Sequence, residues 1–336
     1  MRRFLVPEPD TRVEPGAPPR FSVLIRTYQS ADTVAAAVES ALGQTLPPFE
    51  VIVYDDGSTD GTDAVLRPYG DRIRYLRREN AGAAAAFDGG VEAASGDFVV
   101  VLDADDIFEP ERIEALSELA TARPDLDIVT TDAAWESEGR VVGRFNGAAN
   151  PFEVENQRAA ILERCFIVAP GVRRSAVLGV GGQDTELEVS ADWDCWIRMI
   201  LGGSKAGSVD EPLLVYRLRE GSISSERLSS FQHRVDMLEH LRTNRALRDE
   251  DVAALDAALA RHRQTLALAR AVDAAQRGDG RARELALAVA RDEAQGRKTR
   301  LKAAVLAAAP ASIRPRLVGR LGFPSRLARR QVGSSD

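Results

Sequence analysis

Residues 21–61 read FSVLIRTYQSADTVAAAVESALGQTLPPFEVIVYDDGSTDG, and this stretch decides the fold. Phe21–Ile25 is a short apolar run typical of a strand, and the apolar residues of Asp32–Gly43 recur at helical spacing up to a glycine stop. Glu50–Tyr54 is a second strand, and it is followed by the turn-rich residues 55–61. A strand, a helix and a second strand in this order indicate a parallel sheet.

The same alternation continues as far as residue 131. We predict further strands at Arg72–Leu76, Asp97–Leu102 and Ile128–Thr131, and helices ending at Leu66 and covering Asn80–Ala94 and Pro110–Thr121. The expected fold class is α/β, with a mostly parallel sheet flanked by helices. Ligands bind at the carboxyl ends of such strands. Three polar clusters directly follow strands and should converge there: Thr27–Gln29, Asp55-Asp56 and Asp103–Asp106.

Composition excludes several classes of protein. The chain has 336 residues, two cysteines, three histidines and a formal charge of −7. So few cysteines argue against a disulfide scaffold or a zinc site, and the acidic balance argues against a nucleic-acid binder. No stretch reaches the roughly 20 apolar residues of a membrane span, and the first residues lack the apolar core of a signal peptide. We therefore expect a cytoplasmic protein.

The two ends of the chain differ from its middle. Residues 1–20 hold five prolines and predict a flexible arm, whereas residues 226–295, rich in Ala, Leu and Arg, predict a helical extension. Residues 296–336 hold ten Lys or Arg and one acid, a net of +9, so the preceding residues carry −16. This basic tail is either a solvated charged face or a peripheral anchor on an anionic membrane surface. The anchor would use its interleaved apolar residues: Ile313, Leu317, Val318, Leu321, Phe323 and Leu327.

Asp103-Ala104-Asp105 places two carboxylates at the end of a strand. Hard oxygen ligands of this kind suit Mg²⁺ or Mn²⁺ bound together with phosphates. The alternative is helix capping, and we expect one acid among residues 103–106 to cap the helix near Pro110. Gly82 and Gly89-Gly90 are compatible with a phosphate loop, but no GxGxxG follows the first strand, which argues against a dinucleotide-binding dehydrogenase.

Four segments in order then carry a family resemblance. They are residues 21–62, the run RRENAGAAAAFDGGVEAASGDFVVVLDADDIFEPERI, the run SADWDCWIRMILGG and the run VYRLREGSIS. Together they resemble the family 2 glycosyltransferases of the GT-A fold, with residues 21–225 as the catalytic domain. The resemblance implies transfer of a sugar from a nucleoside diphosphate donor, typically a UDP-sugar, to a hydroxyl of a glycan or lipid-linked glycan. It also implies inversion and a Mn²⁺ or Mg²⁺ cofactor.

The resemblance assigns the donor-binding residues. Thr27 and Tyr28 match the pair that lies along the nucleoside, Asp56 matches the acid that pairs with the base, and Arg78 matches a basic residue that contacts the nucleotide. Arg219 occupies a position often filled by histidine. Because a guanidinium does not ligate cations, the expected role of Arg219 is pairing with the diphosphate.

The resemblance also assigns the catalytic acids. Asp103 and Asp105 match the DxD element, with Asp105 expected to contact the metal directly and Asp103 lying nearer the donor. Asp192 matches the general base that takes a proton from the acceptor hydroxyl. The alternative for Asp192 is the N-cap of the helix that follows.

Other departures from the family pattern leave rival functions open. Arg26 replaces a usual proline at a position expected to lie in a loop, Phe87-Asp88 replaces a common Arg-Asn pair, and Ala191 replaces a common glutamate. Phe87, Ala191 and Arg219 together are compatible with a catalytically impaired binding or scaffold protein. The Asp-nucleophile phosphatases also carry a DxD element, but theirs follows the first strand, whereas Asp103 follows the fourth.

Overall fold

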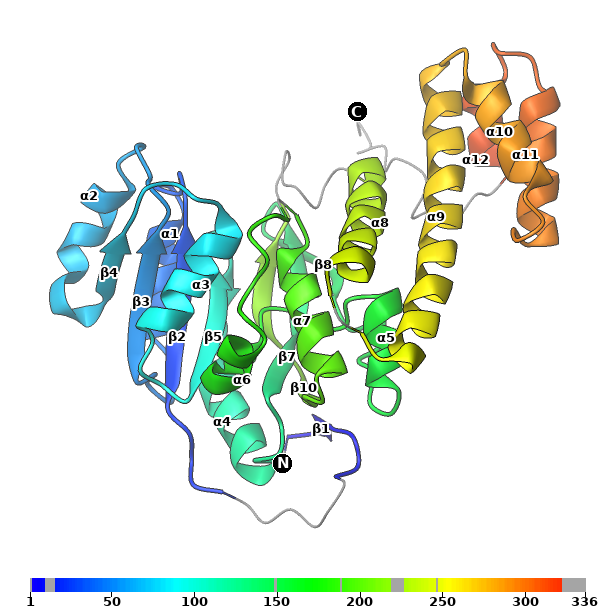
Figure 1. Ribbon diagram of the computed structural model, residues 1–336. Helices are drawn as coiled ribbons and strands as arrows, with labels where there is room; N and C mark the ends of the chain where they lie inside the picture. The colour runs from blue at the N-terminus through cyan, green and yellow to red at the C-terminus, as the bar shows by residue number, and fades with distance from the viewer. Residues whose placement is uncertain are drawn as a thin grey trace. The chain divides into compact units, whose positions relative to one another are not determined.

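The computed structural model describes residues 2–9, 16–147, 150–187, 189–218, 227–245 and 247–321. The chain divides into two compact units between Arg219 and Glu220, slightly before the predicted boundary at residue 225 (Figure 1). In the described residues, every strand belongs to the first unit, and the second unit is helical.

The strands of the first unit are β1 (Phe4–Leu5), β2 (Phe21–Thr27), β3 (Glu50–Asp55), β4 (Arg74–Arg77), β5 (Phe98–Asp103), β6 (Ile107–Phe108), β7 (Ile128–Ser137), β8 (Arg140–Arg144), β9 (Gly171–Arg173) and β10 (Ala206–Arg217). Its helices are α1 (Val34–Leu42), α2 (Thr62–Leu66), the 3₁₀ helix η1 (Arg67–Arg72), α3 (Ala83–Ala93), α4 (Arg112–Ala122), α5 (Gln157–Glu163), α6 (Arg174–Gly179) and α7 (Ala191–Leu201).

Within the described residues, the strands form one mixed sheet in the order β1-β10-β7-β9-β5-β2-β3-β4. Strands β5, β2, β3 and β4 are mutually parallel, as are β7 and β10, and antiparallel β9 joins the two groups. The predicted α/β fold with a mostly parallel sheet is confirmed. The arm contains an ordered piece, because β1 pairs antiparallel with β10, with Phe4 opposite Val209.

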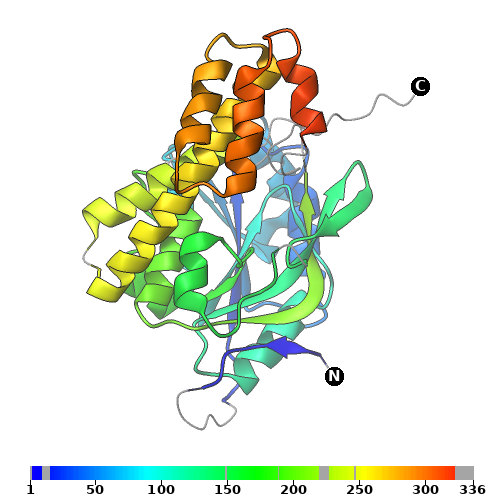
Figure 2. The same ribbon diagram turned by 90° about the vertical axis from the view of Figure 1, so that its right-hand side faces the viewer.

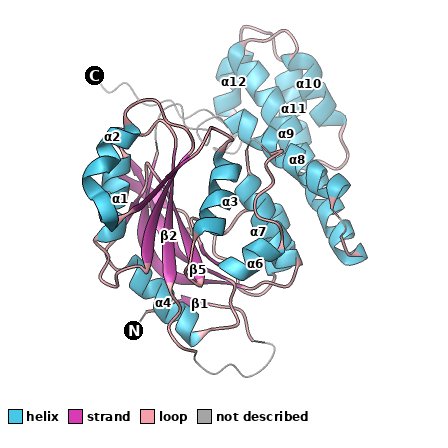
Figure 3. Ribbon diagram, turned by 60° about the vertical axis from the view of Figure 1, so that its left-hand side comes forward, coloured by secondary structure: helices cyan, strands magenta, loops and turns pink. Residues whose placement is uncertain are grey.

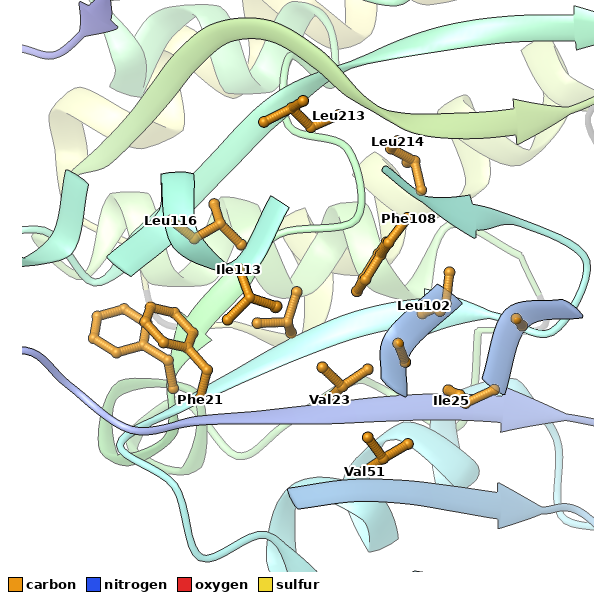
Figure 4. Close-up of a cluster of buried hydrophobic side chains, with 14 of the residues drawn as sticks. Phe21, Val23, Ile25, Val51, Leu102, Phe108, Ile113, Leu116, Leu213 and Leu214 are labelled. Carbon is orange, nitrogen blue, oxygen red and sulfur yellow. The ribbon is translucent and has the colours of Figure 1, made fainter. Parts of the chain in front are cut away.

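Helices cover the central strands on both faces, with α1 on one side and α3 on the other (Figure 3). On the α1 side, alternate apolar residues of β2, β3 and β5 pack with α4 into one core, part of which is drawn in Figure 4. On the α3 side, a Cβ at Gly90 would lie 2.3 Å from Leu24 Cδ1, and one at Gly89 would lie 2.4 Å from the Tyr54 hydroxyl oxygen. These two glycines therefore allow α3 to approach the sheet closely, and they do not form a phosphate loop.

The second unit contains α8 (Arg227–Asn244), α9 (Asp249–Arg277), α10 (Ala282–Arg291), α11 (Arg297–Ala308) and α12 (Arg314–Arg320). In Figure 2 the orange helices α10 and α11 lie side by side. Small and aliphatic residues of α9 to α12 form a common core that includes Leu306 and Val318. No helix in the described part of the chain has the length and apolar composition that a bilayer span requires.

The predicted tail is therefore partly a structural part of this unit. Val318 is buried and is not available to a membrane as predicted, whereas Leu317 and Leu321 are partly buried and pack against the same core. Ile313 is exposed. Phe323 and Leu327 lie outside the described residues.

Candidate active site

The strand register brings the three predicted polar clusters to one edge. Thr27 lies opposite Asp55 in the β2–β3 pair, and Arg26 lies opposite Asp103 in the β2–β5 pair. Because these strands are parallel and adjacent, their carboxyl ends meet there, as the sequence predicts. This places Arg26 inside β2 and corrects its expected position in a loop.

Thr27 and Tyr28 combine an unpaired hydroxyl with an exposed ring. Thr27 is 3% exposed, and in the described residues its Oγ1 has no hydrogen-bond partner. Tyr28 is 52% exposed. A buried hydroxyl without a partner is costly, whereas a ligand bound at this edge would satisfy it. The two residues together suit a flat, hydrogen-bonding ligand such as a nucleoside.

The loop that holds these residues is fastened to the loop after β3. Gln29 adopts a left-handed conformation with φ of 51°. Its side-chain oxygen accepts a hydrogen bond from the backbone N–H of Thr59 at 2.7 Å, and the Ser58 hydroxyl accepts one from the Gln29 N–H at 2.9 Å. The two loops are therefore held together at the sheet edge.

Asp56 is buried and fixes the start of α3. Its two carboxylate oxygens accept hydrogen bonds from the backbone N–H groups of Ala81 and Gly82, both at 2.9 Å. Since each carboxylate oxygen has two acceptor sites, the remaining ones stay available to a base. Arg78 is exposed next to it, and its backbone N–H donates to Asp55 O at 3.0 Å.

The acids after β5 differ in environment. The Asp103 side chain is 45% exposed and forms an ion pair with Arg26, and Asp105 is partly buried. Asp106 is buried, and its Oδ1 accepts the backbone N–H of Arg217 at 3.0 Å. The expectation that one of these acids caps the next helix is wrong. Residue Glu111 stands at the N-cap of α4, and no side chain there makes a capping hydrogen bond.

These acids fit a divalent cation. Burial, together with the negative charges of Asp103 and Asp105, raises the pKa of Asp106 to about 8. Asp103 and Asp105 supply hard carboxylate oxygens at the sheet edge, which is the donor set that Mn²⁺ and Mg²⁺ prefer.

Asp192 lies in the first turn of α7 and is exposed. It is not the N-cap, because Ser190 holds that position with a φ of 66°. Its Oδ1 accepts the backbone N–H of Trp193 at 2.7 Å. Although solvent reaches the residue, the surrounding protein desolvates the carboxylate and raises its pKa, whereas the nearby Arg26 opposes the rise. A carboxylate with a raised pKa is suited to accept a proton.

The second acid of this helix has a different role. Asp194 is fully buried and pairs with Arg198 at 2.8 Å, and Arg198 also donates to the carbonyls of Val180 and Gly182 at 2.6 Å. The same loop is held from α3, because Asp88 accepts the backbone N–H of Gln183 at 2.8 Å. These contacts anchor the segment that leads to Asp192.

Several features of the site were not predicted from sequence. Phe87 and Asp88, which replace the Arg-Asn pair common in the family, have structural contacts instead. Asp88 anchors the loop at Gln183, and Phe87 packs edge-on against Trp196. The Arg26–Asp103 pair also escaped prediction, although Asp103 ends β5 and Arg26 lies one residue before the end of the neighbouring β2. Arg219 lies outside the described residues.

Comparisons with known proteins agree with this geometry. A family model described as Glycosyl transferase family 2 matches residues 22–167. The chain is 29% identical over 214 residues to TuaG of Bacillus subtilis, a protein named for teichuronic acid biosynthesis. That alignment covers 62% of this chain and 83% of TuaG. In contrast, the chain spans only 30% of the Rickettsia prowazekii glycosyltransferase RP339, with 38% identity over 96 residues.

Two solved structures share the fold. S. aureus TarS 1–349 in complex with UDP-GlcNAc superposes with a TM-score of 0.59 at 20% identity, covering 90% of this chain and 89% of that one. The mannosyltransferase PcManGT from Pyrobaculum calidifontis, in complex with GDP-Man and Mn²⁺, gives 0.59 at 18% identity, covering 98% and 92%.

Proposed function

We propose that the chain acts as a family 2 glycosyltransferase, the family whose model matches residues 22–167, and that it transfers a sugar from a UDP-sugar to a hydroxyl of a glycan or lipid-linked glycan, with inversion. The observation that carries the proposal is the buried, unpartnered hydroxyl of Thr27 beside the exposed Tyr28 ring, at the edge where Asp103 and Asp105 also lie. UDP is proposed as the nucleotide because the family resemblance of the sequence implies a UDP-sugar; the two fold neighbours are bound to UDP-GlcNAc and to GDP-Man.

The transfer is a single displacement. Asp192 accepts the proton of the acceptor hydroxyl while that oxygen forms a bond to the anomeric carbon of the donor sugar. The bond from this carbon to the phosphate oxygen breaks, and its electron pair leaves with the nucleoside diphosphate. Attack from the face opposite the leaving group inverts the configuration. A general base of this kind contributes about 10²- to 10⁴-fold in rate.

The donor is held by residues of the same edge. Thr27, Tyr28 and Asp56 bind the nucleoside, and Arg78 contacts the nucleotide. Arg219 lies outside the described residues, and its proposed role is pairing with the diphosphate. Asp103 and Asp105 would hold Mn²⁺ or Mg²⁺, with Asp105 as the principal ligand. When bound, the cation supplies charge stabilisation to the departing diphosphate.

Turnover in the presence of acceptor tests this proposal. We expect the purified chain to release UDP from a UDP-sugar when a glycan acceptor and Mn²⁺ are present. Asp192→Asn should abolish release while UDP affinity, measured by calorimetry, is retained. UDP binding without release for any acceptor in a broad panel would instead identify a binding or scaffold protein.

We also propose that the second unit docks on an anionic membrane surface, which would bring the site to lipid-linked acceptors. Of the predicted apolar residues, Ile313 is exposed, and Leu301 is a further exposed apolar residue of the same basic segment. Leu301 is 67% exposed and Ile313 is 50% exposed, and both lie within the strongly basic segment that begins at Arg297. Basic residues around exposed apolar side chains are typical of interfacial binding.

Vesicle flotation tests the membrane proposal. Leu301→Asp combined with Ile313→Asp should reduce binding to vesicles that contain phosphatidylglycerol. The matched control is Val141→Asp, a change at an exposed valine of β8 in the other unit. Equal flotation of the wild type, the double variant and the control would exclude this surface.

A further inference from the structure

Arg26 lies at the same sheet edge as the candidate site but has no role in the proposed transfer mechanism. It lies in β2 between Tyr54 of β3 and Asp103 of β5, opposite both in the strand register. Directly paired residues of parallel strands point to the same face of a sheet. The guanidinium therefore shares that face with the first acid of the DxD element.

The two side chains form an ion pair in which Arg26 contacts only one carboxylate oxygen of Asp103. Arg26 Nε donates to Asp103 Oδ1 at 3.0 Å, and a second guanidinium nitrogen, Nη2, donates to the same oxygen. The Arg26 side chain is 17% exposed, whereas that of Asp103 is 45% exposed. The arginine therefore lies beneath the acid and holds one of its oxygens, while the carboxylate as a whole still faces solvent.

The positive charge of Arg26 lies in direct contact with the first acid of the DxD element. An arginine keeps its charge at any physiological pH, so this positive charge is permanent. A divalent cation that approaches Asp103 and Asp105 must come close to it.

We propose that Arg26 is a positioning residue that aims Asp103 toward the donor and weakens the binding of a divalent cation to the empty enzyme. The cation then binds well only together with the nucleotide, whose phosphates add the negative charge that Arg26 has offset. This inference rests on the proposed function of Asp103 and Asp105. It predicts that the site has a low affinity for a divalent cation when the donor is absent.

Electron paramagnetic resonance of Mn²⁺ with nucleotide-free protein tests the inference without any turnover. Arg26→Met should tighten Mn²⁺ binding by about tenfold or more, because it removes a like charge next to the site. Arg26→Lys keeps the charge and should leave the Mn²⁺ affinity close to that of the wild type. Arg20→Met is the matched control, since Arg20 directly precedes the same strand and pairs with Asp97.

The positioning role has a separate readout. Because lysine does not reproduce the paired hydrogen bonds to Asp103, Arg26→Lys should lower kcat for UDP-sugar turnover more than it changes KM. Folding of each variant is checked by circular dichroism, and Arg26→Lys remains informative if Arg26→Met does not fold. Unchanged or weaker Mn²⁺ binding by folded Arg26→Met would overturn the inference. In contrast, Mn²⁺ binding that Asp105→Asn does not weaken would refute the proposed metal site itself.

Discussion

Two acids of α7, two positions apart, should respond in opposite ways to the same change. Asp192 is exposed, and its carboxylate accepts a hydrogen bond from the backbone N–H of Trp193. In contrast, Asp194 is fully buried and forms an ion pair with Arg198. Asp→Asn removes one negative charge at either position and preserves the shape of the side chain. The comparison therefore separates a catalytic carboxylate from a structural one.

The magnitudes follow from these surroundings. Asp194→Asn leaves the Arg198 guanidinium buried without its counter-charge. Removing one partner of a buried pair costs about 3–5 kcal/mol. Because Arg198 keeps its bonds to two backbone carbonyls, we expect about 3 kcal/mol. For a unit of this size that corresponds to a fall in Tm of about 6–12 °C. Asp192→Asn should change stability by less than about 0.5 kcal/mol and lower kcat by about 10²- to 10⁴-fold.

Thermal unfolding followed by circular dichroism, together with initial rates of UDP release, measures both effects. We expect a stable but inactive Asp192→Asn and a destabilised Asp194→Asn that retains activity at low temperature. The reasoning is refuted if Asp192→Asn keeps kcat within about tenfold of the wild type. It is refuted equally if the two variants lose the same stability.

Three further outcomes follow from single residues. Thr27→Val should reduce the UDP affinity measured by calorimetry by about fivefold without lowering Tm, because it removes a buried hydroxyl that only a ligand would satisfy. An unchanged UDP affinity would argue against a nucleoside at Thr27. Gly90→Ala should lower the free energy of unfolding, measured by urea denaturation, by about 1–3 kcal/mol, because the new Cβ would meet the Leu24 side chain. The control Gly179→Ala should not lower it, because its Cβ would point into open space. Because the surrounding protein desolvates the Asp192 carboxylate and raises its pKa above the ordinary value of 3.8, kcat/KM should fall at an acid limb above that value as the carboxylate protonates. A limb at or below 3.8 would contradict the assignment.

The central parallel strands were predictable because their apolar runs are uninterrupted. Phe98–Leu102, for example, is buried on both faces, and such strands stand out in a sequence. Strand β10 was missed because Asp210, Glu211 and Pro212 interrupt its apolar pattern, and the register shifts at the proline. β1 is only two residues long and depends entirely on its pairing with β10.

The convergence of the three polar clusters at the strand ends was predictable, but the contacts of their side chains were not. The Arg26–Asp103 pair depends on strand register, which spans 77 positions of sequence. Asp106 accepts a hydrogen bond from the backbone N–H of Arg217, and no local sequence pattern around Asp106 indicates a partner so distant in the chain. In the second unit, the charge of the tail was clear from sequence, but the burial of Val318 depends on packing against other helices.

Anomalous diffraction at the manganese edge, from crystals grown with UDP and MnCl₂, tests the central claim most directly. We expect one strong peak at coordination distance from Asp105, near Asp103, with the uracil beside Thr27, Tyr28 and Asp56. A nucleotide bound away from this sheet edge, or a peak with no contact to Asp105 or Asp103, would contradict it.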